Sequence, residues 1–390
     1  MITDVKIVVQ VKLAPDEAQA AALRRTLHTV NQCANRVSAA SFQAYRLSGS
    51  VRDLRSMAYG ELKARGLGAQ AAQHVIKRVA DAYTTLRAGI RAGSKGPEGS
   101  GRRRKSESKA IVFRADAAHT YDDRCLSWNY DAQTVSIWTM DGRRKNVRFA
   151  CSATALKQLI LYRKGESDLA LRDGTWFLIA TCEVPEAERY EPKDWIGVDR
   201  GIANLATTSD GDNYSGRRLD RYRRWQARKK AEIQATRTRS AKQLLKKRAR
   251  RESRHAAHTN HTISKTVVAV AQRTERGIAL EQLHGIRERV TVRRDQRARR
   301  SSWPFRQLGE FIAYKARRAG VPFIEVDPAY TSQRCPRCGH TARNNRPTRD
   351  HFHCRRCGLA GPADVVAGVN VRDRARSAWV FVNRPPPVPA

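Results

Sequence analysis

The sequence has few acidic residues for its length. Only 37 Asp and Glu residues stand against 75 Lys and Arg residues among 390, which gives a formal net charge of +38 at pH 7. A chain with so much charge of one sign repels itself, so a large polyanion is its expected partner. This imbalance argues against an enzyme of small acidic metabolites and against a neutral scaffold.

Long apolar runs and internal repeats are also missing. No run approaches the roughly 20 apolar residues of a membrane span, so no membrane partner is expected. The first residues, MITDVKIVVQVKL, carry charges through their apolar stretch and offer no small-residue cleavage site, so we expect no secretory signal. Hydrophobic residues still make up 41%, enough for real cores in two or three domains of a cytosolic nucleic-acid-binding protein.

The first half of the chain changes from strand to helix and back to strand patterns. Val5 to Leu13 alternates apolar and polar residues, whereas residues 14–91 show helical spacing that predicts two to four helices. Residues 92–109, which include Arg102, Arg103 and Arg104, are expected to form a mobile basic loop. Short runs rich in β-branched and aromatic residues follow. We therefore predict a β-barrel (1–13 and 110–190) with a helical insert (14–109).

The second half alternates strand and helix patterns. WIGVDRGIANLATTSDGDNY predicts two strands, and a cysteine-rich module precedes the last helix. The other elements expected are a polar helical stretch (216–255), an apolar helix (263–273), a strand (277–283), a basic loop (287–300), a helix (305–319), a strand (321–327) and the last helix (363–378). One domain is expected to comprise 195–330 together with 359–378. The cysteine-rich module is expected at 331–358, and a disordered tail at 379–390.

Four of the eight cysteines have the spacing of a metal site. Cys335, Cys338, Cys354 and Cys357 form two CxxC pairs separated by fifteen residues, which is typical of a closed, structural zinc site with four thiolates. The other four cysteines have no such spacing and are expected to be small buried residues.

Three acids are candidates for a hard-metal site. Asp199 lies in the strand IGVDRG, Glu281 follows the apolar run GIAL, and Asp364 opens the last helix. Each has an ordinary alternative, because Asp364 is also a plausible helix cap and Glu281 is able to pair with an arginine. Acids are scarce in this chain, and burying one is unfavourable without a cation. Oxygen ligands on an open site suit Mg²⁺, and two such ions support phosphodiester hydrolysis.

These segments resemble a known family. GVDRGIANLATTSDG, IALEQL, WPFRQLGEFIAYKARRAG and TSQRCPRCG with CRRCGLAGPADVVAGVNV are similar, in the same order, to the RuvC-like nuclease core of the TnpB family. These are OrfB-type proteins of insertion sequences, related to type V CRISPR effectors. The resemblance covers about 195–374, and the N-terminal half matches only in layout.

The resemblance implies a multi-domain α+β protein, with an RNase H-like (RuvC) α/β domain that contains the zinc ribbon. It implies that Asp199, Glu281 and Asp364 are catalytic and hold Mg²⁺. The partners implied are a guide RNA from the transposon end and double-stranded target DNA, in a prokaryotic cytoplasm. A short flanking DNA motif would be read by the N-terminal half. The chain departs from the family at Val366, where an Asn is common and would support the third acid.

Basic stretches supply candidate nucleic-acid contacts. Residues 216–255 are strongly basic, an imbalance that suits helices laid along phosphates better than a solvated surface. Arg293 to Arg300 is a further basic loop that is expected to gate the site. Tyr222 and Trp225 are either stacking platforms for bases or packing residues. The contacts expected are Arg217, Arg218, Arg221, Arg224, Arg228, Lys229, Lys230, Lys246 and Lys247, with Arg102, Arg103 and Arg104 of the first half.

Three functions compete. The first is an RNA-guided, Mg²⁺-dependent DNA endonuclease, acting as a monomer or dimer, in which base pairing selects the sequence. The second is an RNA-guided DNA-binding repressor with little or no cleavage, for which Val366 is the one hint. The third is a transposase that joins DNA strands through the same three acids.

Overall fold

The computed structural model describes residues 4–283 and 305–382, and the chain forms two compact units. The N-terminal unit is Lys6–Val184, and the C-terminal unit is Pro185–Ala390 together with Met1–Val5. Among the helices of these two ranges, none has the length and apolar character needed to cross a membrane.

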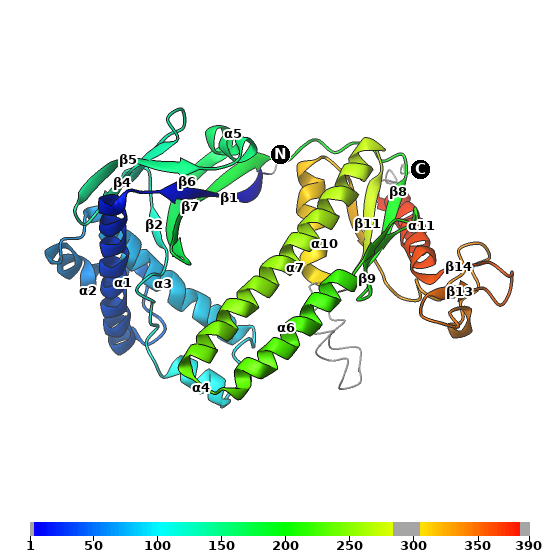
Figure 1. The fold of residues 1–390 in the computed structure, drawn as a ribbon, viewed down its shortest axis with the longest axis horizontal. Helices are drawn as coiled ribbons and strands as arrows, with labels where there is room; N and C mark the ends of the chain where they lie inside the picture. Colours follow the sequence, from blue (N-terminus) through cyan, green and yellow to red (C-terminus); the bar gives the residue numbers. More distant parts are fainter. Residues whose placement is uncertain (1–3, 284–304, 383–390) are drawn as a thin grey trace, which may run out of the picture. The chain divides into compact units, whose positions relative to one another are not determined.

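The N-terminal unit contains a seven-stranded sheet in the order β2-β6-β7-β1-β5-β4-β3 (Figure 1). β1 lies between β7 and β5, so the first strand does join the β-rich segment that follows the helices, as its pattern predicted. β2 and β3 are the edges of this order, and closure into a barrel stays a prediction. The strands are β1 (Asp4–Ala14), β2 (His119–Tyr121), β3 (Leu126–Asn129), β4 (Thr134–Thr139), β5 (Gly142–Ala150), β6 (Arg163–Arg172) and β7 (Thr175–Pro185).

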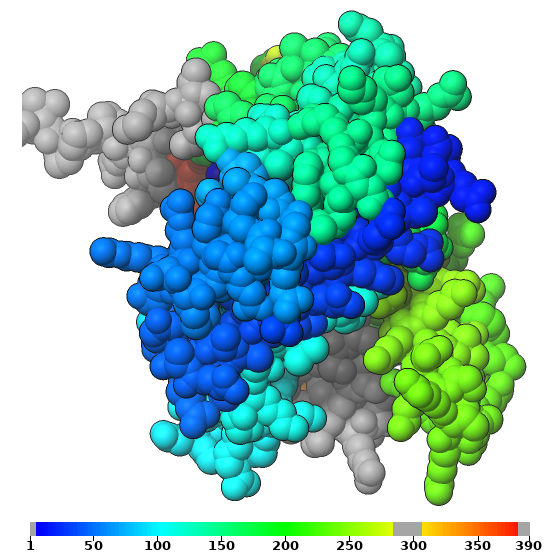
Figure 2. Space-filling model, turned by 90° about the vertical axis from the view of Figure 1, so that its left-hand side faces the viewer, coloured from blue at the N-terminus to red at the C-terminus, as the bar shows by residue number. Residues whose placement is uncertain are grey.

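Helices fill the stretch between β1 and β2. α1 (Glu17–Tyr45), α2 (Val51–Ala64) and α3 (Ala69–Arg91) pack around one apolar core and form the blue surface in Figure 2. Asp16 and Ser50 cap the first two helices through capping boxes with Gln19 and Asp53. A short helix, α5 (Ala153–Tyr162), follows β5.

The prediction of a mobile loop at 92–109 is wrong in part, because the helix α4 (Gly101–Glu107) forms there. The Ser100 hydroxyl accepts a hydrogen bond from the Arg103 backbone N–H and caps this helix. Arg103 also pairs with Glu107 one turn later, at 2.8 Å. The arginines expected to contact nucleic acid here therefore lie on a short helix, and one of them has an acidic partner.

The C-terminal unit contains a five-stranded mixed sheet in the order β10-β9-β8-β11-β12. β8 (Trp195–Asp199), β11 (Gly277–Glu281) and β12 (Phe323–Val326) are parallel, whereas β9 (Asn204–Thr208) and β10 (Asn213–Ser215) extend the sheet antiparallel. The near-continuous apolar runs of β8 and β11 fit strands that are covered on both faces.

Different helices cover the two faces of this sheet. Ile196 and Ile278 pack with α7 (Arg239–Arg273) and α10 (Phe305–Arg318), whereas Trp195 and Ala279 pack with α11 (Ala363–Val382). The approach of α11 requires Gly197, since a Cβ there would lie 2.0 Å from the Gly368 carbonyl oxygen. This glycine thus lets α11 approach β8 closely.

The helices of this unit differ from the expected pattern in two places. The polar stretch and the apolar helix are not separate: after α6 (Arg217–Ala235), α7 runs without a break from 239 to 273. Thr238 caps α7, and Arg237 before it has a positive φ of 52°. The last helix continues to Val382, four residues beyond the end expected for it.

The cysteine module lies between β12 and α11. It contains a 3₁₀ turn, η1 (Arg343–Asn345), and a two-stranded antiparallel sheet of β13 (His351–His353) and β14 (Ala360–Pro362). Buried Asn345 fastens the turn, because its side-chain amide donates to the carbonyl oxygens of Gln333 and His340.

Candidate functional site

Two of the three predicted acids end neighbouring parallel strands. Asp199 is the last residue of β8, and Glu281 is the last residue of β11. Val198 pairs with Leu280, so the next residue on each strand reaches the same edge of the sheet. Asp364 is the second residue of α11, which packs across β8. The structure therefore brings the three acids together from distant parts of the chain.

Burial and mutual repulsion perturb these carboxyl groups. The pKa of Asp199 is raised to about 8, first by burial and then by the negative charges of Glu281 and Asp364, while Arg346 and Arg200 oppose the rise. Burial also raises the pKa of Glu281, which is 7% exposed, while a hydrogen bond from the Thr331 hydroxyl opposes the rise. Such a group of acids favours a bound cation.

Asp364 is held at both oxygens. The Arg346 guanidinium donates to Oδ1 at 2.8 Å, and the Asn204 side-chain amide donates to Oδ2 at 2.9 Å. Sequence reasoning missed both residues as partners of this acid. Asn204 lies inside the motif that carried the family resemblance, whereas nothing in the sequence marks Arg346, which comes from the loop between the CxxC pairs.

Val366 has no polar side-chain atom with which to support Asp364, as an Asn at this position would. Its side chain packs in a small apolar cluster with Ala363, Phe352 and the module's Cys335 and Cys354. A branched apolar side chain suits this place between α11 and the module. The structure thus gives Val366 a packing role, and gives the support of Asp364 to other residues.

The four cysteines of the module do converge. Their four Sγ atoms all lie within 4.8 Å of one another, close enough to hold one metal ion. Within 4–283 and 305–382, this is the group of three or more possible metal ligands that lies so close together. The Sγ atoms of Cys335 and Cys357 are 3.6 Å apart, as are those of Cys338 and Cys354. Within the described residues, the three acids do not form a group of this compactness.

A basic groove lies beside the acids. This cavity has a volume of about 630 Å³. It is lined by Ala203, Gly216, Arg217, Asp220, Arg221, Arg224, Trp225, Arg228 and Arg349. Arg346 donates through Nε to the Arg349 carbonyl oxygen at 3.0 Å, and Ala203 precedes Asn204. Residues next to both partners of Asp364 therefore line the groove.

Only part of the predicted basic set lies in this groove. Four of the predicted α6 arginines line it, although Arg224 also pairs with Asp220 at 2.6 Å. The predicted residues outside the lining are Arg218, Lys229, Lys230, Lys246 and Lys247 of α6 and α7, and Arg102, Arg103 and Arg104 of α4. The basic loop Arg293 to Arg300, with its gating role, lies outside the described residues.

The two aromatic residues of α6 have different environments. Trp225 is 45% exposed, lines the groove, and carries the Arg248 guanidinium 4.8 Å from its ring centre. Tyr222 instead packs on His255 of α7, with ring centres 4.5 Å apart, and its hydroxyl accepts from Gln226. Packing thus accounts for Tyr222, while Trp225 offers a ring face to the groove.

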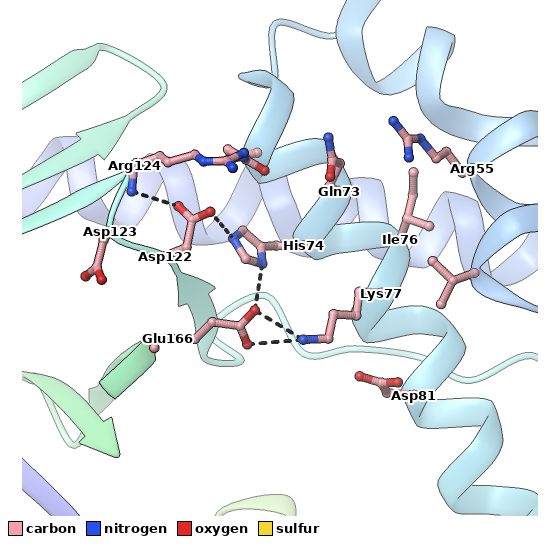
Figure 3. Close-up of a pocket in the computed structure, with 13 residues that line it drawn as sticks. Arg55, Gln73, His74, Ile76, Lys77, Asp81, Asp122, Asp123, Arg124 and Glu166 are labelled. Atoms are coloured by element: carbon pink, nitrogen blue, oxygen red, sulfur yellow. Dashed lines mark hydrogen bonds and ion pairs between the residues drawn. The ribbon is translucent and has the colours of Figure 1, made fainter. Parts of the chain in front are cut away.

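A second cavity of about 630 Å³ lies within the N-terminal unit (Figure 3). His74 of α3 is directed between two carboxylates, with Nε2 3.7 Å from Asp122 and Nδ1 3.8 Å from Glu166. Lys77 also pairs with Glu166, at 3.1 Å. These contacts join α3 to Asp122, which follows β2, and to Glu166 of β6, so we assign the cluster a structural role.

Two family models match the C-terminal unit. The model described as "Probable transposase" matches residues 180–284, which contain Asp199 and Glu281. The model described as "Cas12f1-like, TNB domain" matches residues 305–371, which contain the four cysteines and Asp364.

Curated relatives cover different shares of the chain. The TnpB-like protein MJ0751 of Methanocaldococcus jannaschii is 31% identical over an alignment of 213 residues, which covers 51% of this chain and 76% of that protein. The "Putative RNA-guided DNA endonuclease InsQ" of Escherichia coli (strain K12) is 27% identical over 51% of this chain and 53% of its own length. A "CRISPR-associated endodeoxyribonuclease Cas12f1" of Sulfoacidibacillus thermotolerans is 39% identical over 29% of this chain and 26% of its length. The chain thus spans about half the length of InsQ and about a quarter of the length of this Cas12f1.

The fold itself has a counterpart among solved structures. CasPhi-2 (Cas12j), solved bound to crRNA, covers 100% of both chains with a TM-score of 0.54 and 11% sequence identity, so the likeness concerns the fold alone. A mixed α+β fold with a four-cysteine module before the third acid defines a protein of the insertion-sequence OrfB type. The chain belongs to the TnpB family, since it covers most of MJ0751 at 31% identity.

Proposed function

We propose that the chain is an RNA-guided, Mg²⁺-dependent DNA endonuclease of a transposable element. The observation that carries the proposal is the convergence of Asp199, Glu281 and Asp364, with the raised pKa of Asp199, beside the basic groove. Perturbed carboxyl groups next to a phosphate-binding surface are what hydrolysis of a phosphodiester requires. The relatives InsQ and Cas12f1, named as endonucleases, agree with this reaction class.

The acids would hold divalent ions. Their hard oxygen donors fit Mg²⁺, and many phosphoryl-transfer sites hold two such ions about 4 Å apart. When bound, the ions would supply Lewis acidity at the phosphate. Thr331 orients Glu281 through its hydroxyl, Asn204 and Arg346 orient Asp364, and groove arginines bind the neighbouring phosphates.

The cysteine module would hold one structural zinc ion. A tetrahedral ion with Zn–S bonds of about 2.3 Å places its sulfurs about 3.8 Å apart, close to the 3.6 Å of the two Sγ pairs. Four thiolates leave no open position, so the ion would stabilise the module rather than act on substrate.

The remaining assignments complete the proposal. The five-stranded sheet with its helices would be the RuvC domain, and the seven-stranded sheet with α1 to α4 would read the flanking motif as a barrel with a recognition insert. The partners would be a guide RNA from the transposon end and double-stranded target DNA, in the cytoplasm of a prokaryote. Pairing between guide and target would select the sequence.

The test is cleavage of a guide-matched duplex by the purified protein with the RNA that co-purifies with it. Asp199→Ala is expected to lower the rate at least ~10³-fold, because the site loses an ion ligand. Asp212→Ala is the matched control, since this acid is exposed and lies outside the site. An Asp199→Ala protein that cleaves like the parent would falsify the proposal.

The same experiment separates the competing functions. Tight target binding without Mg²⁺-dependent products would favour the repressor. Joined strands in place of simple breaks would favour the transposase. Val366, the one hint in favour of the repressor, packs in an apolar cluster with the cysteine module.

A further inference from the structure

The two partners of Asp364 differ in kind. Asn204 offers a neutral amide to Oδ2, whereas Arg346 offers a positive charge to Oδ1. The carboxyl group is 13% exposed, so both contacts are made mostly out of water. A neutral donor fixes the direction of a carboxylate without cancelling its charge.

The backbone around Asn204 is held tightly. The Gly216 N–H donates to the Ala203 carbonyl oxygen at 2.6 Å. A Cβ on Gly201 would lie 2.8 Å from the carbonyl oxygen of Asn204, so the turn from Asp199 to Asn204 needs glycine there. Asn204 then begins β9, which pairs back on the strand of Asp199. The amide is therefore positioned by the same hairpin that carries the first acid.

We propose that Asn204 is a positioning residue that aligns the third acid with the first. By holding Oδ2 of Asp364, it fixes the direction of this carboxylate relative to Asp199, which lies on the same hairpin as Asn204. This inference rests on the proposed function. It also explains how the site tolerates Val366, because the amide support comes from β9 and not from α11.

The test measures Mn²⁺ binding to the purified full chain, by calorimetry or electron paramagnetic resonance, in addition to cleavage. Asn204→Ala and Asn204→Leu are expected to weaken Mn²⁺ binding about 10- to 100-fold, the usual effect of losing a partner of a metal ligand. Asn213→Ala is the matched control, since this Asn lies on the adjacent β10 and is exposed. In cleavage, kcat should fall with little change in KM for the target, because Asn204 does not line the groove.

The outcomes separate this inference from the proposed function. If Asp364→Ala weakens Mn²⁺ binding and both Asn204 variants bind like the parent, the positioning role is wrong and the nuclease site stands. If Asp199→Ala and Asp364→Ala both leave Mn²⁺ binding unchanged, the inference and the metal site fall together. A change in zinc content in the Asn204 variants would overturn the local role, since the effect would then come from the module.

Discussion

Asp199 shows the cost of grouping acids within a fold. Its folded pKa of about 8 lies well above the value of about 3.9 in an unfolded chain. A carboxyl group whose pKa is raised on folding favours the fold fully below about pH 4 and less as pH rises toward 8. Without a divalent cation, Asp199 therefore destabilises the protein at neutral and alkaline pH.

Replacing this acid with its neutral isostere should relieve that cost. In EDTA at pH 8, Asp199→Asn is expected to be at least ~1 kcal/mol more stable than the parent, or about 2–4 °C in Tm for a unit of this size. The gain should shrink toward pH 4, and Mg²⁺ should stabilise the parent more than the variant. Thermal melts from pH 4 to 8.5 with and without Mg²⁺ measure both effects.

The control for these melts is Asp212→Asn, an exposed acid outside the site. A difference between Asp199→Asn and the parent that does not change with pH would contradict the assigned cause, because a packing effect does not titrate.

At the scale of elements, α6 sets the charge of the basic groove. Arg221 and Arg228 line it, and Trp225, which is 45% exposed, lines it as well. Each arginine that contacts a phosphate releases about one counterion on binding. Arg221→Ala with Arg228→Ala should weaken single-stranded DNA binding about tenfold and lower the salt slope by about 1 to 2.

This prediction is checked by fluorescence anisotropy from 50 to 300 mM salt. Lys246→Ala is the matched control, because this basic residue lies on α7 outside the groove lining. If the control weakens binding as much as the groove variants, the affinity comes from overall charge and the groove has no special role.

The elements also show how far the sequence could lead. Apolar runs that end in Asp199 and Glu281 predicted the two parallel strands, and CxxC spacing predicted the converging sulfurs, because both signals are local. The contacts of Asn204 and Arg346 with Asp364 span 160 and 18 residues and depend on how the sheet, the module and α11 pack. The unbroken course of α7 was missed because its polar and apolar halves pack on different neighbours.

At the scale of the whole molecule, one small module supports a site made by a much larger unit. Phe352, Cys335 and Cys354 share an apolar cluster with Ala363 and Val366, on either side of the third acid. The Ala363 N–H also donates to the Asp350 carbonyl oxygen of the module at 3.0 Å. Loss of a structural ion would loosen the start of α11, and Asp364 and Arg346 with it.

Zinc removal should therefore abolish cleavage without unfolding the protein. Cys354→Ser is expected to lose the bound ion and at least ~10²-fold in cleavage rate, since a four-thiolate module depends on its ion for folding. Cys151→Ser, which changes a half-buried thiol of the N-terminal unit, should keep both. Zinc content is measured by release to a chromogenic chelator, and circular dichroism reports the helices of both units. If Cys354→Ser loses its zinc yet cleaves like the parent, the module does not position the third acid.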